Sequence, residues 1–196
     1  MDSTTRRYRH GNLPTALVAA ARKILDENGL QAAGLRETAR RVGVSATAAY
    51  RHFASKEDLL AAVAAEGFRE LRAAIETSSR GAHPLIRGGV AYVEFAQRNP
   101  GLFRLMFGPV IAERAKYPAL DAAAGSVSEF LWRAVAEFDQ RPREDNVTAT
   151  AAWSIVHGLA NLTVDGFVPP ARGRMLVEEI LARTQLPGPP ASQQSR

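Results

Sequence analysis

The chain has 196 residues, 46% of them hydrophobic and 23% charged, so it can bury a core and is too apolar for wholesale disorder. It contains no cysteine, which excludes a disulfide scaffold, a thiol nucleophile and a cysteine zinc site. The net charge is +5, and the basic residues are concentrated at the start of the chain, where residues 1–56 carry ten Lys or Arg against four Asp or Glu. A basic N-terminal segment is typical of nucleic-acid binding, although a solvated basic surface has the same composition.

The first 80 residues predict four helices. Asn12 caps the first helix, in which apolar residues recur at helical spacing until Asn28-Gly29 ends it. Ser55 opens the fourth helix, with Asp58 three residues later as a shortened capping box. The second, third and fourth helices are expected at about 35–42, 46–52 and 55–78.

A break at 78–81 predicts a domain boundary near residue 80. Pro84 opens the next helix, Asn99-Pro100 ends it, and residues 102–107 are expected to form a brief apolar turn. Further helices are expected at about 119–138, 144–167 and 172–184. The sequence has no alternation typical of strands and no internal repeat, so the fold is predicted to be all-α with about nine helices.

Residues 35–53 carry the strongest functional signal. The expected helix at 35–42 is followed by the turn Gly43-Val44-Ser45 and by a second short helix at 46–52. Glycine allows the positive φ that the turn needs, and Ala39, four residues before it, lets the two helices cross closely. This spacing predicts a helix-turn-helix, whose second helix is narrow enough to enter a major groove.

At these positions the chain resembles the TetR family of bacterial transcriptional regulators. The matching segments are His10-Gly11-Asn12-Leu13, Ala39-Arg40-Arg41-Val42-Gly43-Val44-Ser45 and Ala49-Tyr50-Arg51-His52-Phe53-Ala54-Ser55-Lys56. One departure is Gly34, where members of the family usually have Ser or Thr; glycine can cap a helix but lacks the hydroxyl that would contact a phosphate.

The resemblance implies a domain organisation. Members of the family are homodimers whose N-terminal helices bind double-stranded operator DNA and whose C-terminal helices dimerise and hold a small-molecule effector. We therefore expect a helix-turn-helix domain at 1–56, a connecting helix at 57–79 and a ligand-binding and dimerisation domain at 80–186. Residues 187–196 are rich in Pro, Ser and Gln and are expected to be a disordered tail.

Carried over residue by residue, the resemblance implies a DNA-facing set centred on the recognition helix. Thr47 and Tyr50 would face the DNA, and Ala46 and Ala48 would pack near base edges or thymine methyl groups. Lys56 would contact phosphate at the start of the fourth helix. The full set of DNA-binding candidates is Arg36, Ser45, Ala46, Thr47, Ala48, Tyr50, Arg51, His52 and Lys56.

Several of these residues have an alternative structural interpretation. Tyr50 could be a core aromatic residue, and His52 could have a surface role in place of a phosphate contact. Arg6, Arg7 and Arg9, which precede the first helix, could reach the DNA backbone or minor groove, or could form a flexible solvated arm.

The C-terminal region is rich in large apolar residues, which at helical spacing form a core more often than a ligand site. Trp153 to Gly158 looks like the Trp-His-Gly signature of one C-terminal subclass of the family, and one helical turn puts Trp153 and His157 on the same face. His157 is either a hydrogen-bonded core residue or the polar anchor of a ligand. The ligand-binding candidates are Phe95, Phe103, Phe107, Trp132, Trp153 and His157.

The helix expected at 144–167 also predicts a dimer. Its residues are apolar or small on all sides, so more than one side must be covered. One side can face its own domain and another a symmetry mate. The helix expected at 172–184 could complete a four-helix interface.

Motifs of catalysis are absent from the sequence. It has no phosphate loop, no Gly-x-Gly-x-x-Gly, no His-Glu-x-x-His and no Gly-x-Ser-x-Gly, and its four histidines lack metal-ligand spacing. No apolar run is long enough to span a membrane. We therefore expect no enzyme activity, no cofactor, no metal and no membrane partner, in a cytoplasmic protein.

The resulting interpretation is a ligand-responsive DNA-binding regulator. It would bind a palindromic operator as a homodimer and be released by a small apolar effector of unknown identity. The expectation of repression, and not activation, is based only on the usual behaviour of the family. The alternative from another class is a helical small-molecule-binding protein that does not bind an operator.

Overall fold

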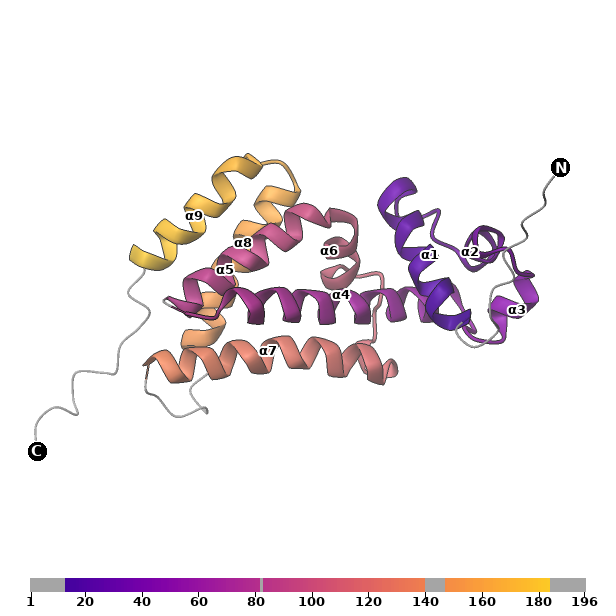
Figure 1. Ribbon diagram of the computed structural model, residues 1–196, viewed down its shortest axis with the longest axis horizontal. Helices are drawn as coiled ribbons and strands as arrows, with labels where there is room; N and C mark the ends of the chain where they lie inside the picture. Colours follow the sequence, from indigo (N-terminus) through magenta and orange to yellow (C-terminus); the bar gives the residue numbers. More distant parts are fainter. Residues whose placement is uncertain (1–12, 82, 140–146, 184–196) are drawn as a thin grey trace, which may run out of the picture.

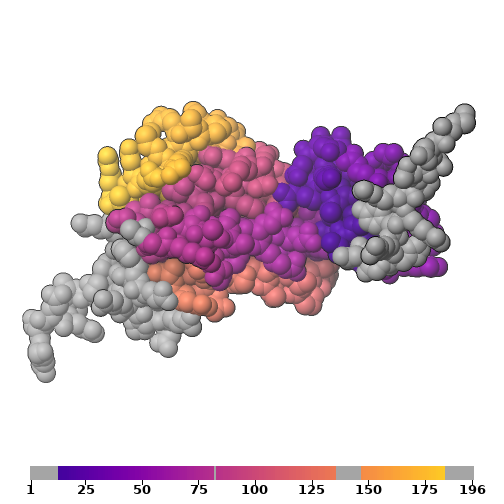
Figure 2. Space-filling model, in the orientation of Figure 1, coloured from indigo at the N-terminus to yellow at the C-terminus, as the bar shows by residue number. Residues whose placement is uncertain are grey.

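A computed structural model of the chain describes residues 13–81, 83–139 and 147–183. Within these ranges nine α-helices and one short 3₁₀ turn form the fold, and no strand occurs, as the sequence predicts. The molecule is elongated, with the N-terminal helices at one end and the last helix near the other (Figures 1 and 2). The arginines at the start of the chain, the cap Asn12 and the tail at 187–196 lie outside the described residues.

The N-terminal end consists of α1 (Leu13–Asn28), α2 (Leu35–Val42) and α3 (Ala46–Tyr50). Gly29 ends α1 and Gly43 ends α2, each at a positive φ that the sequence predicted from their position after a helix. The third helix is shorter than the expected 46–52, because Arg51 is its C-cap and Phe53 turns inward to pack against the core.

The long helix α4 (Lys56–Ser78) connects the two ends of the molecule. Its capping box is confirmed, since the Ser55 hydroxyl accepts the Asp58 N–H at 3.0 Å and the Asp58 carboxylate accepts the Ser55 N–H at 3.0 Å. It packs against α1 near its N-terminal end and against α5, α6 and α7 along the rest of its length (Figure 1). One hydrophobic core therefore runs through both ends of the protein.

The C-terminal body surrounds the second half of α4. Its helices are α5 (Pro84–Arg98), α6 (Pro100–Phe107), α7 (Pro118–Asp139), α8 (Val147–Val164) and α9 (Pro170–Arg183). In Figure 1, α7 follows one side of α4 and α5 and α9 lie on the other, while α8 runs from α9 past α4 to α7. Within the described residues, no helix is both long enough and apolar enough to cross a membrane.

The expectation of a brief turn at 102–107 was wrong. These residues belong to α6, which Pro100 opens directly after α5 ends at Arg98. Proline is favourable in the first helical turn, and the apolar face of α6 is buried between α1, α4 and α5. Pro170 likewise begins α9 two residues before the expected start.

The N-terminal end is attached to the body through α6 as well as α4. The Arg22 guanidinium on α1 donates to the Asn99 side-chain oxygen at 2.7 Å and pairs with Asp26 and with Glu70 on α4. Next to Asn99, Gly101 brings the start of α6 against the end of α1 at Leu25. Because α6 also contacts α4 and α5, it forms a second connection between the ends of the molecule.

The crossing of α4 and α6 at Gly67 has no room for a methyl group. A Cβ on Gly67 would lie 2.7 Å from the Met106 sulfur and 2.8 Å from a Leu102 methyl carbon, and both side chains are buried. We expect Gly67→Ala to lower the free energy of unfolding by about 1–2 kcal/mol because of overpacking. Urea unfolding at fixed protein concentration measures the change.

The matched control is Gly125→Ala on α7, where a Cβ would meet nothing within 4 Å. There the same substitution removes only glycine's helix penalty and should stabilise the protein by up to about 1 kcal/mol. Equal stabilisation by both substitutions would show that the α4–α6 crossing is not tight.

Candidate functional site

A helix-turn-helix is formed by α2, the turn at 43–45 and α3. The Val44 N–H bonds the Ala39 carbonyl at 3.0 Å across the turn, and Ala39 and Ala49 are buried where the two helices cross. The buried Thr38 hydroxyl donates to the Gly34 carbonyl at 2.9 Å, which ties down the start of α2. Gly34 itself caps α2 without a side-chain contact. The short second helix is thereby held rigidly on the first.

The outer face of α3 is open to solvent. Thr47, Arg51 and His52 are exposed, and the Tyr50 side chain is 47% exposed, so Tyr50 is not a core aromatic residue. Ala46 and Ala48 are half-buried at its edges. The candidates on this helix therefore share one accessible surface.

Ser45 differs from these residues, because its hydroxyl already accepts the Ala48 N–H at 3.1 Å and caps α3. Its visible role in the structure is to begin the recognition helix.

The cations around this surface fall into two groups. Arg40 makes two hydrogen bonds to Glu37, at 2.6 and 2.8 Å, and these bonds lower the pKa of the exposed Glu37 carboxyl. Arg41 pairs with Glu27 on α1. Arg36 and Arg51 are exposed and have no ion pair among the described residues. These two guanidinium groups are consequently available to a phosphate.

Lys56 has a partner that sequence reasoning missed. Its ammonium group donates to the Gln31 carbonyl at 3.1 Å, in the loop between α1 and α2. This contact fixes the side chain beside the helix-turn-helix and leaves further N–H donors, since an ammonium group has three.

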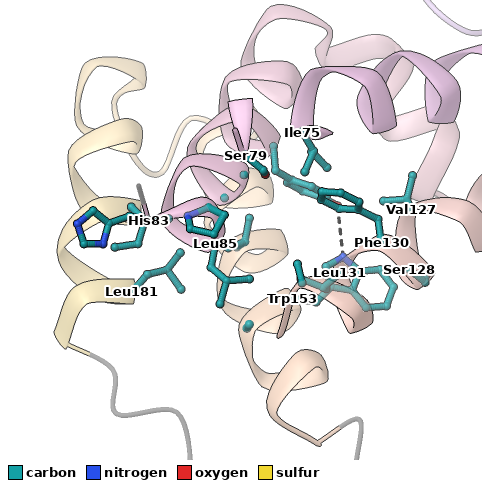
Figure 3. A pocket seen from close by; sticks show the side chains of 18 of the residues that line it. Ile75, Ser79, His83, Leu85, Val127, Ser128, Phe130, Leu131, Trp153 and Leu181 are labelled. Atoms are coloured by element: carbon teal, nitrogen blue, oxygen red, sulfur yellow. Dashed lines mark hydrogen bonds between the residues drawn. The ribbon is translucent and has the colours of Figure 1, made fainter. Parts of the chain in front are cut away.

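A cavity of about 550 Å³ lies at the other end of α4, enclosed by α4, α5, α7, α8 and α9 (Figure 3). Its wall is mostly apolar, as is usual for a small-molecule site of this size. The lining residues are Ile75, Ser79, His83, Pro84, Leu85, Ile86, Gly88, Gly89, Tyr92, Val127, Ser128, Phe130, Leu131, Ala134, Ala152, Trp153, Val156, Leu181 and Ala182.

Two consecutive glycines on α5 contribute bare backbone to the cavity wall. A Cβ on Gly88 would lie 2.8 Å from the Ser79 hydroxyl of α4. A Cβ on Gly89 would lie 2.9 Å from a Leu181 methyl carbon of α9 and 3.3 Å from Val156 on α8. The glycines thus allow α5 to approach α4 on one side and α8 and α9 on the other.

A line of hydrogen bonds begins at the cavity and leads into the body. The Trp153 N–H donates to the Tyr92 hydroxyl at 3.5 Å, shown by the dashed line in Figure 3, and the Tyr92 oxygen lies 2.8 Å from His157 Nδ1. Burial raises the pKa of Tyr92 and lowers the pKa of His157. Both groups are therefore neutral at pH 7, and the tyrosine can donate to the imidazole.

Of the six predicted ligand-binding residues, Trp153 lines the cavity. Phe103, Phe107 and His157 instead pack together beside Tyr92, with ring centroids 4.7–5.5 Å apart. Phe95 is buried, and Trp132 is 41% exposed; neither belongs to the cavity wall. The aromatic pattern thus located the neighbourhood of the cavity, while the wall itself consists mainly of aliphatic and small residues that periodicity does not single out.

No group of three or more His, Cys, Asp or Glu side chains suited to a metal occurs in the part of the chain that the structure describes.

Comparisons with known proteins agree with this geometry. Residues 17–63 match the family model described as "Bacterial regulatory proteins, tetR family", and residues 85–184 match "Tetracyclin repressor-like, C-terminal domain". The HTH-type transcriptional activator FasR of Mycolicibacterium smegmatis is 30% identical over 154 residues, which cover 76% of this chain and 68% of FasR.

Solved structures show the same architecture. A protein of unknown function from Rhodococcus sp. RHA1 is 29% identical, with a TM-score of 0.75 over 91% of this chain and 97% of the other. The TetR family regulator PfmR from Thermus thermophilus shares the fold at 23% identity, with a TM-score of 0.57 over 86% of this chain and 98% of PfmR. Since the family models cover both the helix-turn-helix and the C-terminal body, the chain belongs to the TetR family of transcriptional regulators and is a DNA-binding regulator.

Proposed function

We propose that the protein binds a near-palindromic operator as a homodimer and is released by a small apolar effector. The observation that carries this proposal is the exposed face of α3, with Thr47 and Tyr50 accessible and with Arg36 and Arg51 free of ion pairs among the described residues. An accessible helix flanked by unpaired cations suits a major groove between two phosphate backbones. The α2–α3 unit would then be repeated about 34 Å away in the second subunit.

The proposed functions are assigned to segments on either side of the connecting helix. We assign DNA binding to residues 1–56, connection to 57–79, and effector binding and dimerisation to 80–186. The cavity lies against the C-terminal half of α4, whose N-terminal end carries the helix-turn-helix. An effector changes operator affinity only if it prefers one spacing of the two DNA-binding units over the other.

We assign α8 and α9 to the dimer interface. Among the described residues, four of the exposed large apolar side chains outside the cavity wall lie on these helices or in the segment between them: Val147, Leu162, Phe167 and Met175. Such a surface on a lone subunit is typical of an interface. Gly158 on α8 has open space around it, which would permit close approach of a second copy.

The sign of regulation is a separate question, because the curated relative is named an activator. We propose repression, in which the dimer occupies a promoter and the effector vacates it. A reporter fused to the DNA upstream of the protein's own gene tests this sign: deletion of the gene should raise expression, and a fall would indicate activation.

Tyr50→Ala should weaken operator binding tenfold or more, because the variant would lose one hydrogen bond to a charged phosphate. Lys56→Ala should also weaken binding and should reduce the slope of affinity against salt by about one counterion. A gel shift with the upstream DNA, repeated over a salt series, measures both effects.

The control is Arg98→Ala on α5, an exposed cation in the body that should leave operator affinity unchanged. Circular dichroism should show an intact fold for all three variants, because Tyr50 is exposed. Full operator affinity in folded Tyr50→Ala protein would remove this residue from the DNA contact.

Leu162→Asp should dissociate the dimer at micromolar concentration, because the Leu162 side chain is 45% exposed on α8 and a buried unpaired carboxylate opposes association. Sedimentation velocity measures the shift toward a 21.2 kDa species. Ala122→Asp, an exposed position on α7, is the matched control. Two variants with the same unchanged mass would exclude this surface of α8 from the interface.

A further inference from the structure

The wall of the cavity is poor in ionisable side chains in the part of the chain that the structure describes. None of its lining side chains belongs to Lys, Arg, Asp or Glu. The polar lining side chains are two hydroxyls, one imidazole, one phenol and one indole: Ser79, Ser128, His83, Tyr92 and Trp153. A ligand in this space would therefore meet hydrogen-bonding groups at a few points and hydrocarbon elsewhere.

Arg72 on α4 is a cation near the cavity that has partners outside the wall. Arg72 lies behind Phe130, with its guanidinium carbon 4.2 Å from the ring centroid, and it bonds the Ser126 carbonyl and pairs with Glu76. Arg72 is not part of the wall, whereas Phe130 is. The guanidinium thus stacks on a ring of the wall, and its buried Nε has no hydrogen-bond partner among the described residues.

Arg87 on α5 belongs to a separate surface depression, which Glu94 and Glu178 also line. Among the described lining residues, the one basic group is the exposed His83, in the connection that precedes α5.

The polar contact best placed to serve a ligand is the Trp153–Tyr92 pair. The indole N–H of Trp153 is 3.5 Å from the Tyr92 oxygen, at the long limit of a hydrogen bond, and Trp153 is 37% exposed. An N–H so weakly held can turn to a better acceptor. Burial keeps the Tyr92 hydroxyl protonated, because it raises the pKa of that group, so the pair offers the indole N–H as a donor and contains no anion.

We propose that the cavity selects an uncharged apolar molecule with one hydrogen-bond acceptor directed at Trp153, and that it discriminates against carboxylate and ammonium forms of the same skeleton. A charged group in this wall would lose its hydration without gaining an ion pair. This inference rests on the proposed function only for its regulatory meaning, since the selectivity is a property of the cavity alone.

The experiment compares four probes that share a ten-carbon chain: 1-decanol, methyl decanoate, decanoate and decylammonium. The full-length protein carries Trp132→Phe, which leaves Trp153 as its single tryptophan and changes a residue outside the cavity wall. Saturable changes in Trp153 fluorescence give the four affinities at pH 7.5. We expect the two neutral probes to bind at least about tenfold more tightly than the two ions, because the charge of each ion would be desolvated in the cavity without gaining a partner.

A pair of variants on α7 locates the binding. Ala134→Leu adds bulk to the cavity wall and should abolish binding of methyl decanoate, whereas Ala122→Leu, at an exposed position of the same helix, should leave it unchanged. The acceptor contact is tested by calorimetry on Trp153→Phe, which should bind methyl decanoate several-fold more weakly because the N–H donor is gone.

Two outcomes would overturn the proposal. One is decanoate binding as tightly as 1-decanol with sensitivity to Ala134→Leu; in that case loss of the binding in His83→Gln would identify His83 as the anion partner. The other is absence of a saturable signal from all four probes.

Operator release is measured separately by gel shift. A neutral probe that binds the cavity without releasing DNA would contradict the proposed effector response and leave the selectivity intact. An anion that binds more tightly than the neutral probes and releases DNA would contradict the selectivity and support the effector response.

Discussion

The structure depends on the burial of α4 along its whole length. Leu59, Leu60 and Val63 are buried near its start, and Phe68 and Leu71 are buried further along, so one helix supplies core side chains to both ends of the molecule. Neither end has a core that is independent of this helix, because the buried cluster is continuous from α1 to α9. Displacing α4 at the cavity therefore changes contacts throughout its length, since close-packed interiors transmit strain.

The connection through α6 limits how that displacement can occur. Arg22 ties α1 to Asn99 at the start of α6, and Arg104 on α6 bonds the Val164 carbonyl and Asp165 at the end of α8. Phe103 and Phe107 on the same helix touch the His157 ring. A change at α8 thus reaches α1 by a second series of contacts, and α4 and α6 must move together or the α1 contacts must break.

Much of this arrangement could be predicted from the sequence, because caps and glycine stops are local. The capping box at Ser55, the turn at Gly43 and the start at Pro84 all depend on residues within one helical turn. The helix α6 was missed, since a proline directly after another helix looks like a stop. The cavity wall was also missed beyond Trp153, because its residues come from five helices and share no spacing. Partners such as Gln31 for Lys56 depend on tertiary contacts that no local pattern contains.

The paired glycines at 88 and 89 have a consequence for how ligand preference can change in relatives of this protein. A side chain there would have to displace side chains of α4, α8 or α9, so packing on three neighbours restricts this part of the wall. The opposite wall on α7 has no such restriction, because Val127, Ser128 and Leu131 are only half-buried. Substitutions that change which ligand is bound should therefore accumulate on α7, while the α5 wall keeps the same shape in relatives that bind different ligands.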